Sequence, residues 1–433
     1  MLNPDTKTDC FELPDHIDTV RQRMLNWVKP FSMFCFLDNQ GYAHGPRSQE
    51  WLLAAGCRRR LTLQAGGALD QLEAFWRQQS TWLFGHLAYD LKNELEPLSS
   101  DHPDGIGFPD LSFFEPEILI RLDGARLEIT APDPAAVFQD LCGTAAGLPG
   151  PPVRHPLAIR SRFSRPGYLA RIEALQRHIR RGDCYEINFC QEFFAENARV
   201  DPVSLYHQLS RLSPNPFSAF YRCQDCYLAC ASPERFLRRA GSTLVSQPIK
   251  GTAPRHTGQP DLDRRSREAL LASAKERAEN VMVVDLVRND LSRVCLPGSV
   301  RVEELCGLYA FPQVYQLIST VSGRLPAETG LASILRACFP MGSMTGAPKR
   351  RVMELIEQYE VTRRGIFSGA LGYIDPQGNF DFNVVIRSVM YQAQRQYLSF
   401  QAGSGITSYS DPAREWEECL LKAAAIQAVL QAG

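Results

Sequence analysis

A series of short apolar runs separated by turn residues most constrains how this chain can fold. The runs are rich in β-branched and aromatic residues, and Gly, Pro, Ser, Asn or Asp lies between them, a pattern typical of strands. In the middle of the chain they cover residues 184–194, 217–221, 226–231, 236–239 and 243–245. Helical patterns lie between some of these runs, without a regular alternation of strand and helix. The sequence therefore predicts a β-rich core with interspersed helices rather than repeated βαβ units.

The first part of the chain shows the same mixture of short elements. Helices are expected at 16–28 and 69–77, strands at 31–37, 111–122 and 126–129, and a strand running into a helix start at 82–90. From 131 to 156 proline and glycine dominate, apart from a short apolar piece at 135–141. That composition is typical of a connector. We therefore predict an N-terminal region (1–130), a connector (131–160) and a large C-terminal region (161–433).

Two predicted helices in the C-terminal region carry acidic residues at helical spacing. A long helix is expected over 263–295, where Glu276 and Glu279 stand three apart and point to one side. A strand and glycine turn over 400–406 lead into a helix after Pro412, in which Glu418 and Lys422 stand four apart. From the residues alone, these are equally well explained as a solvated helix face and a simple ion pair.

Composition favours an ordinary globular protein. The 433 residues carry a net charge of -1 and are 44% hydrophobic, which gives no reason to expect nucleic-acid or membrane binding. No run approaches the length of a membrane span, and residues 1–5 lack the start of an export signal, so we expect a cytoplasmic protein. An odd number of cysteines, 13, favours reduced thiols.

Three of these cysteines, Cys223, Cys226 and Cys230, include a Cys-x-x-Cys spacing that can hold zinc. No second pair follows at a matching distance, and Cys230 lies in an apolar run. A buried strand is therefore the preferred interpretation.

One lysine stands out between a strand-like run and a glycine turn, in the stretch Ser246-Gln247-Pro248-Ile249-Lys250-Gly251-Thr252. Gly251 can adopt backbone angles closed to other residues and allows a ligand to approach the main chain. A desolvated lysine there would be a candidate amine nucleophile. Because an ordinary lysine has a pKa of about 10.4, that role predicts a lowered pKa for Lys250. Without further context, a solvated lysine in a surface loop is the better explanation of this stretch.

Several stretches in order along the chain resemble those of chorismate-utilising enzymes. They are Ser232–Phe236, Pro248–Thr252, Lys275–Asn280 with Val284–Leu291, Phe339–Lys349, Arg364–Ala370, Ala402–Ile406 and Asp411–Glu418. Together they span about residues 165–430, whereas residues 1–130 match only loosely. The resemblance implies an α/β (α+β) fold with two facing antiparallel sheets, helices outside and a site in the cleft between the sheets. The N-terminal region would add strands to the sheets.

The lysine indicates which reaction to expect within that family. Members with Pro-Ile-Lys-Gly-Thr convert chorismate and ammonia to 4-amino-4-deoxychorismate through a covalent lysine intermediate, whereas those that form anthranilate have alanine at the position of Lys250. A member that forms anthranilate and a catalytically silent homologue are the alternatives. The chain has no Gly-x-Cys-x-Gly nucleophile for glutamine hydrolysis. Ammonia is therefore expected from a separate glutamine amidotransferase subunit.

The resemblance also implies roles for individual residues. Lys250 would attack chorismate and Glu234 would protonate the leaving C4 oxygen. Glu279 and Glu418 would bind Mg²⁺, with Glu276 orienting its waters. The positions expected to line the substrate are Gly251, Thr252, Gln316, Ser343, Arg387, Gly403, Gly405 and Lys422.

Three positions depart from the family pattern. Gln316 replaces a common histidine and cannot exchange a proton near neutral pH. Phe367 replaces a common tyrosine. Glu186 stands where water-adding members have a lysine, which weakens a water-adding alternative.

Overall fold

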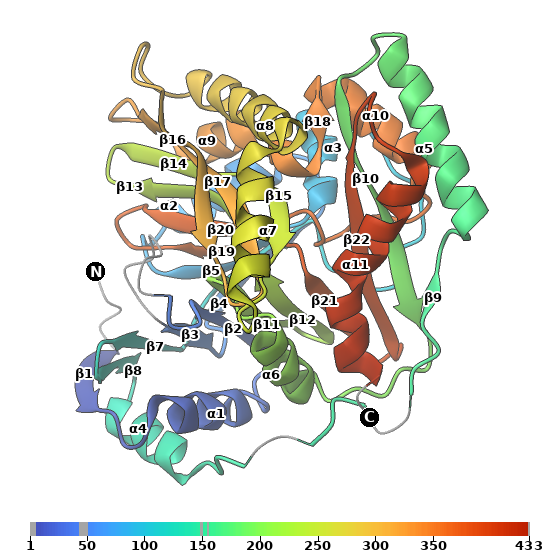
Figure 1. Cartoon of the computed structure of the whole chain (residues 1–433). Helices are drawn as coiled ribbons and strands as arrows, with labels where there is room; N and C mark the ends of the chain where they lie inside the picture. Colours follow the sequence, from blue (N-terminus) through green and yellow to red (C-terminus); the bar gives the residue numbers. More distant parts are fainter. Residues whose placement is uncertain (1–5, 43–50, 148–149, 154–155, 432–433) are drawn as a thin grey trace.

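Two large antiparallel sheets form the interior of the protein, and most helices lie outside them (Figure 1). The computed structural model describes residues 6–42, 51–147, 150–153 and 156–431. Residues 1–5, at which we found no export signal, lie outside the described residues, as do 148–149 and 154–155 of the predicted connector. The predicted fold class is confirmed.

The larger sheet has twelve strands, and β9 (Arg160–Ser161) pairs with β10 beside the main path. In spatial order the other strands are β1 (Lys7–Glu12), β8 (Arg126–Ala131), β7 (Ile118–Asp123), β3 (Trp51–Ala55), β2 (Met33–Asp38), β11 (Phe217–Cys223), β12 (Cys226–Ser232), β21 (Ser388–Gln392), β22 (Tyr397–Ile406), β10 (Glu186–Ala195) and β18 (Gly346–Ala347). The prediction of a buried strand at the cysteine cluster is confirmed, since Cys226 and Cys230 lie on β12.

The smaller sheet has ten strands, and β16 (Arg301–Ala310) pairs with β17 beside the main path. In spatial order the other strands are β15 (Ile249–Pro254), β17 (Val314–Arg324), β14 (Thr243–Gln247), β13 (Arg235–Ala240), β20 (Phe380–Val384), β19 (Ala370–Ile374), β5 (Leu83–Leu87), β6 (Leu111–Glu115) and β4 (Arg59–Leu63). Residues of the N-terminal region thus supply strands to both sheets.

Eleven α-helices and two short 3-10 turns are found in the described residues. They are α1 (Ile17–Trp27), α2 (Ala68–Arg77), η1 (Tyr89–Leu91), α3 (Lys92–Leu95), α4 (Pro134–Gly143), α5 (Arg165–Arg180), α6 (Pro202–Leu212), α7 (Pro260–Ala272), α8 (Ala274–Ser292), α9 (Leu331–Cys338), η2 (Gly342–Met344), α10 (Lys349–Tyr359) and α11 (Pro412–Gln431). None of these helices is long and apolar enough to cross a membrane.

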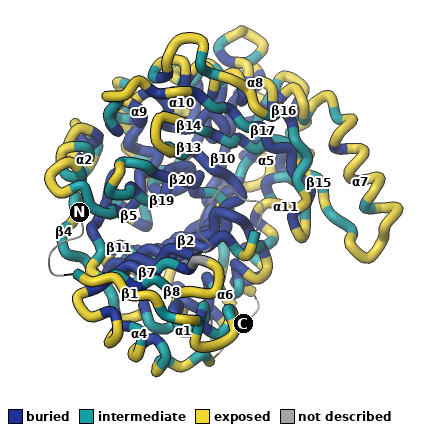
Figure 2. The backbone as a smooth tube through the Cα atoms, turned by 90° about the vertical axis from the view of Figure 1, so that its left-hand side faces the viewer, coloured by how far each residue is buried: buried dark blue, intermediate teal, exposed yellow. Residues whose placement is uncertain are grey.

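Alternating side chains on β2 explain how the two layers of core form. Met33, Cys35 and Leu37 point into the core between the sheets, whereas Phe34 and Phe36 point to the outer face of the larger sheet. Successive strand residues face opposite sides, so a strand buried on both faces is apolar throughout. Helices α1, α4, α5, α6, α10 and α11 cover that outer face. Figure 2 shows the buried strands inside and the largely exposed α7 extending away from them.

Three sequence-based expectations were wrong in detail. The predicted helix 263–295 is two helices, because α7 ends at Ala272 and Ser273 caps the start of α8. The run 111–122 is two strands, β6 and β7, separated by Pro116. The predicted glycine turn within 400–406 is strand, because β22 continues through Gly403 and Gly405 in register with β10.

Candidate active site

Most of the predicted site residues lie where the chain passes between the two sheets or on neighbouring strands that face each other. Glu234 follows β12 of the larger sheet and precedes β13 of the smaller one. Arg387 lies in the reverse crossing, from β20 to β21. Lys250 is on β15 of the smaller sheet, and Glu186 starts β10 of the larger sheet.

Lys250 lies in a strand with a local irregularity, not in a loop. The pairing of β15 with β17 shifts register between Ile249 and Thr252. Gly251 allows this shift because its φ of 90° lies in the left-handed region, which favours glycine. A Cβ atom at Gly251 would also lie 3.2 Å from Cβ of Glu276. The glycine therefore brings the backbone beside Lys250 against the first turn of α8.

The side chain of Lys250 pairs with Glu186. Lys250 Nζ lies 2.5 Å from Glu186 Oε1, and the two side chains are 13% and 3% exposed. Burial lowers the pKa of Lys250, but the carboxylates of Glu186, Glu279 and Glu234 outweigh burial and raise that pKa above its ordinary value. The predicted lowering of the Lys250 pKa is therefore wrong for the protein without substrate, since the expectation did not include a carboxylate in contact with the amine.

Glu234 is a buried carboxyl in a setting suited to holding a proton. Its Oε1 accepts a hydrogen bond of 2.6 Å from Ser343 Oγ. Burial raises its pKa from 4.5 to about 7, against the opposing effects of Ser343, Lys250 and Arg387. A carboxyl with a pKa near neutrality is suited to general acid catalysis.

The guanidinium group of Arg387 is a cation that a ligand could pair with. Its backbone φ is 50°, an uncommon value for a residue with a side chain. Burial lowers the pKa of Arg387, and the Glu234 carboxylate opposes that effect. Within the described part of the chain, its guanidinium has no hydrogen-bond or ion-pair partner. A guanidinium in this state is suited to a two-pronged contact with a ligand carboxylate.

A group of carboxylates surrounds Lys275 at the start of α8. Lys275 Nζ lies 3.7 Å from Glu279 Oε1 and 3.7 Å from Glu415 Oε1. Burial raises the pKa of Glu279 to about 7. Glu279 Oε1 is buried and accepts no hydrogen bond from the residues that the structure describes. Glu276, one helical turn earlier, also has its pKa raised by burial.

Glu418 faces a different cation. Its Oε1 lies 2.8 Å from Lys422 Nζ, which also donates a 3.0 Å hydrogen bond to the carbonyl oxygen of Gly403. Burial raises the pKa of Glu418, but Lys422, Lys275 and Lys250 together outweigh burial and lower that pKa below its ordinary value. Lys422 is thus already paired with two of the residues predicted with it.

The predicted metal residues meet the chemical needs of Mg²⁺ without forming a closed cage. Among the described residues, no group of three or more His, Cys, Asp and Glu side chains converges as metal ligands. Mg²⁺ keeps several waters and needs only one or two protein carboxylates. Glu279 lies one turn from Glu276 on the same helix, and its Oε1 accepts no hydrogen bond from the described residues, which fits that requirement.

The remaining predicted residues differ in how closely they approach this region. A Cβ atom at Gly405 would lie 2.5 Å from Glu186 Oε1 and 2.9 Å from Lys250 Nζ, so Gly405 lines the ion pair directly. Gln316 on β17 stands opposite Thr252 on β15. Gln316 is buried, and its Oε1 has no hydrogen-bond partner in the described part of the chain. Thr252 is exposed.

Three residues contact predicted site residues or lie beside them in a way that the sequence did not predict. They are Glu186, Lys275 and Glu415. Glu415 is 2% exposed and accepts a 2.5 Å hydrogen bond from Ser404 Oγ. A sequence signal for it existed, because Glu415 precedes Glu418 by three residues, as Glu276 precedes Glu279. The pairing of Glu186 with Lys250 had no such signal, since the two residues lie 64 positions apart.

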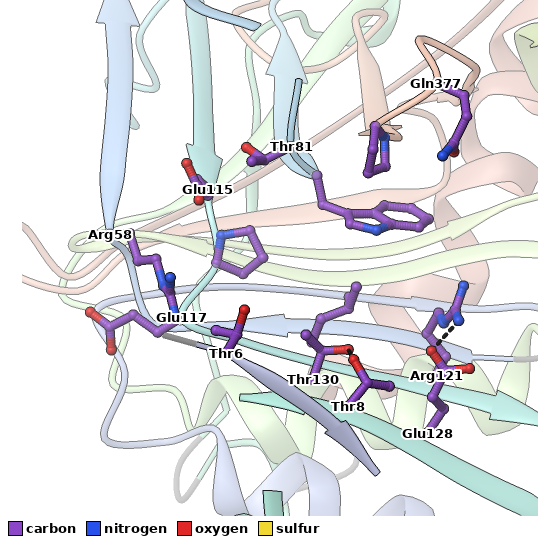
Figure 3. A pocket seen from close by; sticks show the side chains of 14 residues that line it. Thr6, Thr8, Arg58, Thr81, Glu115, Glu117, Arg121, Glu128, Thr130 and Gln377 are labelled. Carbon is purple, nitrogen blue, oxygen red and sulfur yellow. Dashed lines mark hydrogen bonds and ion pairs between the residues drawn. The ribbon is translucent and has the colours of Figure 1, made fainter. Parts of the chain in front are cut away.

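A concavity without any of the predicted site residues lies elsewhere, among N-terminal strands and the turn after β19 (Figure 3). It has a volume of about 330 Å³, and its lining includes Thr8, Trp82, Arg121 and Gln377. Arg121 is paired with Glu128 at its edge. None of the predicted site residues lines this concavity, so we do not assign the chemistry to it.

Comparisons with known proteins agree with the motifs. Residues 39–428 match the family described as chorismate binding enzyme. The chain is 38% identical over 341 residues to aminodeoxychorismate synthase component 1 of Klebsiella aerogenes, covering 77% of this chain and 74% of the relative. It is 37% identical over 353 residues to anthranilate synthase component 1 of Thermus thermophilus, covering 79% and 76%. The crystal structure of anthranilate synthase component I from Streptococcus pneumoniae superimposes with a TM-score of 0.77 at 25% identity, covering 89% of this chain and 93% of that one.

Proposed function

Because the chain belongs to the family of chorismate binding enzymes, we propose that it aminates chorismate at C4 to give 4-amino-4-deoxychorismate. This is the activity expected of an aminodeoxychorismate synthase large subunit. One observation carries the choice of product: the lysine of the Pro-Ile-Lys-Gly-Thr stretch points to Glu186 in the region between the sheets, close enough to Glu234 for their charges to interact. A surface lysine, the alternative interpretation, would not be 13% exposed.

The reaction needs Lys250 as a free amine and Glu234 as a protonated carboxyl group. Lys250 first loses a proton to solvent water, because only the free amine has a lone pair. Its nitrogen then forms a bond to C2 of chorismate while the ring double bond shifts and the C4–O bond breaks. Glu234, protonated below a pKa of about 7, gives its proton to the departing oxygen, which leaves as water. Ammonia then adds at C4, the double bond shifts back and the lysine leaves C2 as an amine.

Other side chains would bind and orient the substrate. The unpaired guanidinium of Arg387, beside Glu234, suits one of the two carboxylates of chorismate. Ser343 already donates to Glu234 and would keep its carboxyl group oriented toward the leaving oxygen. The buried Oε1 of Gln316 is free to accept a hydrogen bond from substrate.

The proposed cofactor is Mg²⁺, held by Glu279 and Glu418, with Glu276 orienting its waters. When bound, the cation would neutralise the substrate carboxylate and favour the free-amine form of a nearby lysine. The Oε1 of Glu279, which is buried and accepts no hydrogen bond from the described residues, supports this choice of residue.

The proposed ammonia source is a glutamine amidotransferase subunit, because the chain carries no nucleophile motif for glutamine hydrolysis. Free ammonium would replace that subunit in an assay. This makes the activity of the isolated chain directly measurable.

The competing function is amination at C2 to give anthranilate. It is favoured by the similarity to the Thermus thermophilus anthranilate synthase component 1, which is nearly as high as that to the Klebsiella aerogenes relative. The two functions differ in product, since anthranilate is fluorescent and 4-amino-4-deoxychorismate yields p-aminobenzoate only after a lyase is added.

The test is to incubate the purified chain with chorismate, Mg²⁺ and ammonium, then identify the products with and without added lyase. We expect p-aminobenzoate only in the presence of lyase. Anthranilate as the main product would refute the proposal in favour of the competing function. No consumption of chorismate would instead support a catalytically silent homologue.

A further inference from the structure

The ion pair between Lys250 and Glu186 joins the two sheets across the site. Lys250 lies on β15 of the smaller sheet and Glu186 on β10 of the larger one, with 2.5 Å between Nζ and Oε1. Both side chains are largely shielded from water, at 13% and 3% exposure. A hydrogen bond between two charged groups that are shielded from water is stronger than the contact of an exposed surface pair.

The surrounding backbone leaves room for this pair. Gly405, on β22 next to β10, would place a Cβ atom 2.5 Å from Glu186 Oε1 and 2.9 Å from Lys250 Nζ. Any side chain at position 405 would therefore push the two groups apart. The absence of a side chain there lets the lysine reach across to the larger sheet.

The pair has a chemical consequence, because an ammonium ion cannot act as a nucleophile. Lys250 faces carboxylates from several elements: Glu186 on β10, Glu234 between β12 and β13, Glu276 and Glu279 on α8 and Glu418 on α11. Of these, only Glu186 is within hydrogen-bond distance of Nζ in the described part of the chain. Glu186 is thus the residue whose release most directly frees the amine.

We propose that Glu186 is the positioning residue of Lys250: it holds the side chain across the space between the sheets as an ammonium, and Lys250 becomes nucleophilic only when this pair opens. The nucleophilic role of Lys250 in this proposal rests on the proposed function. The resting pair itself is a property of the protein without substrate. The second carboxylate oxygen of Glu186 is buried and has no hydrogen-bond partner among the described residues, so a donor group of a ligand could compete with Lys250 for this carboxylate.

The proposal is tested on the protein without substrate by measuring how fast Lys250 reacts with acetic anhydride in EDTA. Peptide mass spectrometry gives the rate at Lys250 relative to Lys29, an exposed lysine in the same chain. Glu186→Gln keeps the shape of the side chain and removes its charge. At pH 8 we expect Lys250 to react at least about tenfold faster in this variant, which corresponds to a fall in its pKa of about one unit, with the rate at Lys29 unchanged.

A matched control lies on the same strand. Glu192 is also on β10 and 4% exposed, but pairs with Arg162. Glu192→Gln is expected to leave the acetylation of Lys250 at the wild-type rate. Equal rates at Lys250 in wild type and Glu186→Gln would overturn the proposal.

The wild-type protein alone provides a second measurement if the variant fails to fold. The proposal predicts that the midpoint of Lys250 acetylation against pH lies above that of Lys29, and a midpoint at or below that of Lys29 would overturn it. A chorismate adduct on Lys250 is a separate readout. An adduct together with an unaffected acetylation rate in Glu186→Gln refutes only the positioning role. Faster acetylation in Glu186→Gln with no adduct in wild type supports the positioning role and refutes the covalent step of the proposed function.

Discussion

At the scale of single residues, Glu234 combines a functional advantage with a cost in stability. Its buried carboxyl group, 4% exposed, has a pKa raised by burial from 4.5 to about 7. Because this pKa is higher in the folded than in the unfolded protein, stability is full below pH 4.5 and decreases as the pH rises through about 7. This pKa shift corresponds to a loss of about 3 kcal/mol in the free energy of unfolding between pH 4.5 and about 7.

Glu234→Gln removes both the acid and this cost. We expect the rate of amination to fall by about 10²- to 10⁴-fold, the usual contribution of a general acid, and the decline in wild-type activity above pH 7 to disappear. In EDTA, the variant is expected to gain about 3 kcal/mol of stability relative to wild type between pH 4.5 and 8. Urea unfolding at the two pH values measures this gain. A parallel pH dependence in both proteins would contradict the assigned pKa.

Lys250→Met tests the nucleophile while keeping the length and apolar part of the side chain. We expect amination to fall by more than about a hundredfold, or about 2.7 kcal/mol in barrier. Mass spectrometry of quenched wild-type reactions is expected to find a substrate adduct on Lys250 and none in the variant. Full activity of Lys250→Met would remove the covalent role.

The sequence predicted that Lys250 and Glu234 belong to one site, but it misjudged the environment of the lysine. Both residues lie in local motifs, so their types and spacing are visible along the chain. Glu186 approaches Lys250 only because two sheets face each other, and such a contact has no local pattern. The sequence therefore could not predict the effect of Glu186 on the pKa of Lys250.

At the scale of elements, the start of α8 shows what a local signal can and cannot reveal. Ser273 caps the helix, and its Oγ accepts a 3.3 Å hydrogen bond from the backbone N–H of Glu276. The spacing Ser273-Ala274-Lys275-Glu276 is a typical helix-start signature, yet a single helix was expected over 263–295. The glycines of β22 were expected to form a turn, because no local signal marks this stretch as a strand. It is a strand because it pairs with β10.

The capping role predicts a specific loss of stability. Ser273→Ala is expected to lower the free energy of unfolding by about 1 kcal/mol, as for other helix caps. Urea unfolding in EDTA measures it without any contribution from metal. Ser273→Thr keeps a side-chain acceptor and is expected to retain most of the stability. If alanine and threonine behave alike, the Oγ hydrogen bond is not what begins the helix.

At the scale of the whole molecule, the resemblance correctly predicted two facing antiparallel sheets, which strand patterns alone did not determine. The patterns located most strands but gave no strand order, because order depends on pairings such as β2 with β11, far apart in sequence. The structure adds that the proposed metal residues come from both layers. Helix α8 packs on β15 and β17 of the smaller sheet, whereas α11 packs on β22 of the larger one.

A cation bound between α8 and α11 would therefore stabilise the molecule as a whole. At Mg²⁺ concentrations of about a hundred times its dissociation constant, the expected gain is about 2.7 kcal/mol, measured as a rise in unfolding temperature relative to EDTA. Glu279→Gln and Glu418→Gln are each expected to reduce this rise. An unchanged rise in both variants would refute the assignment of these carboxylates.

Lys275 allows a more specific test of the Mg²⁺ site. Its ammonium group lies 3.7 Å from both Glu279 and Glu415 in the protein without metal. It partly neutralises carboxylates that would otherwise repel one another, and a divalent cation at the same carboxylates makes it unnecessary. Lys275→Met is therefore expected to unfold at a lower temperature in EDTA and to show a larger rise with Mg²⁺ than wild type. Lys29→Met, at an exposed site, controls for the loss of one positive charge. Equal rises in the two variants would mean that Lys275 and Mg²⁺ do not share these carboxylates.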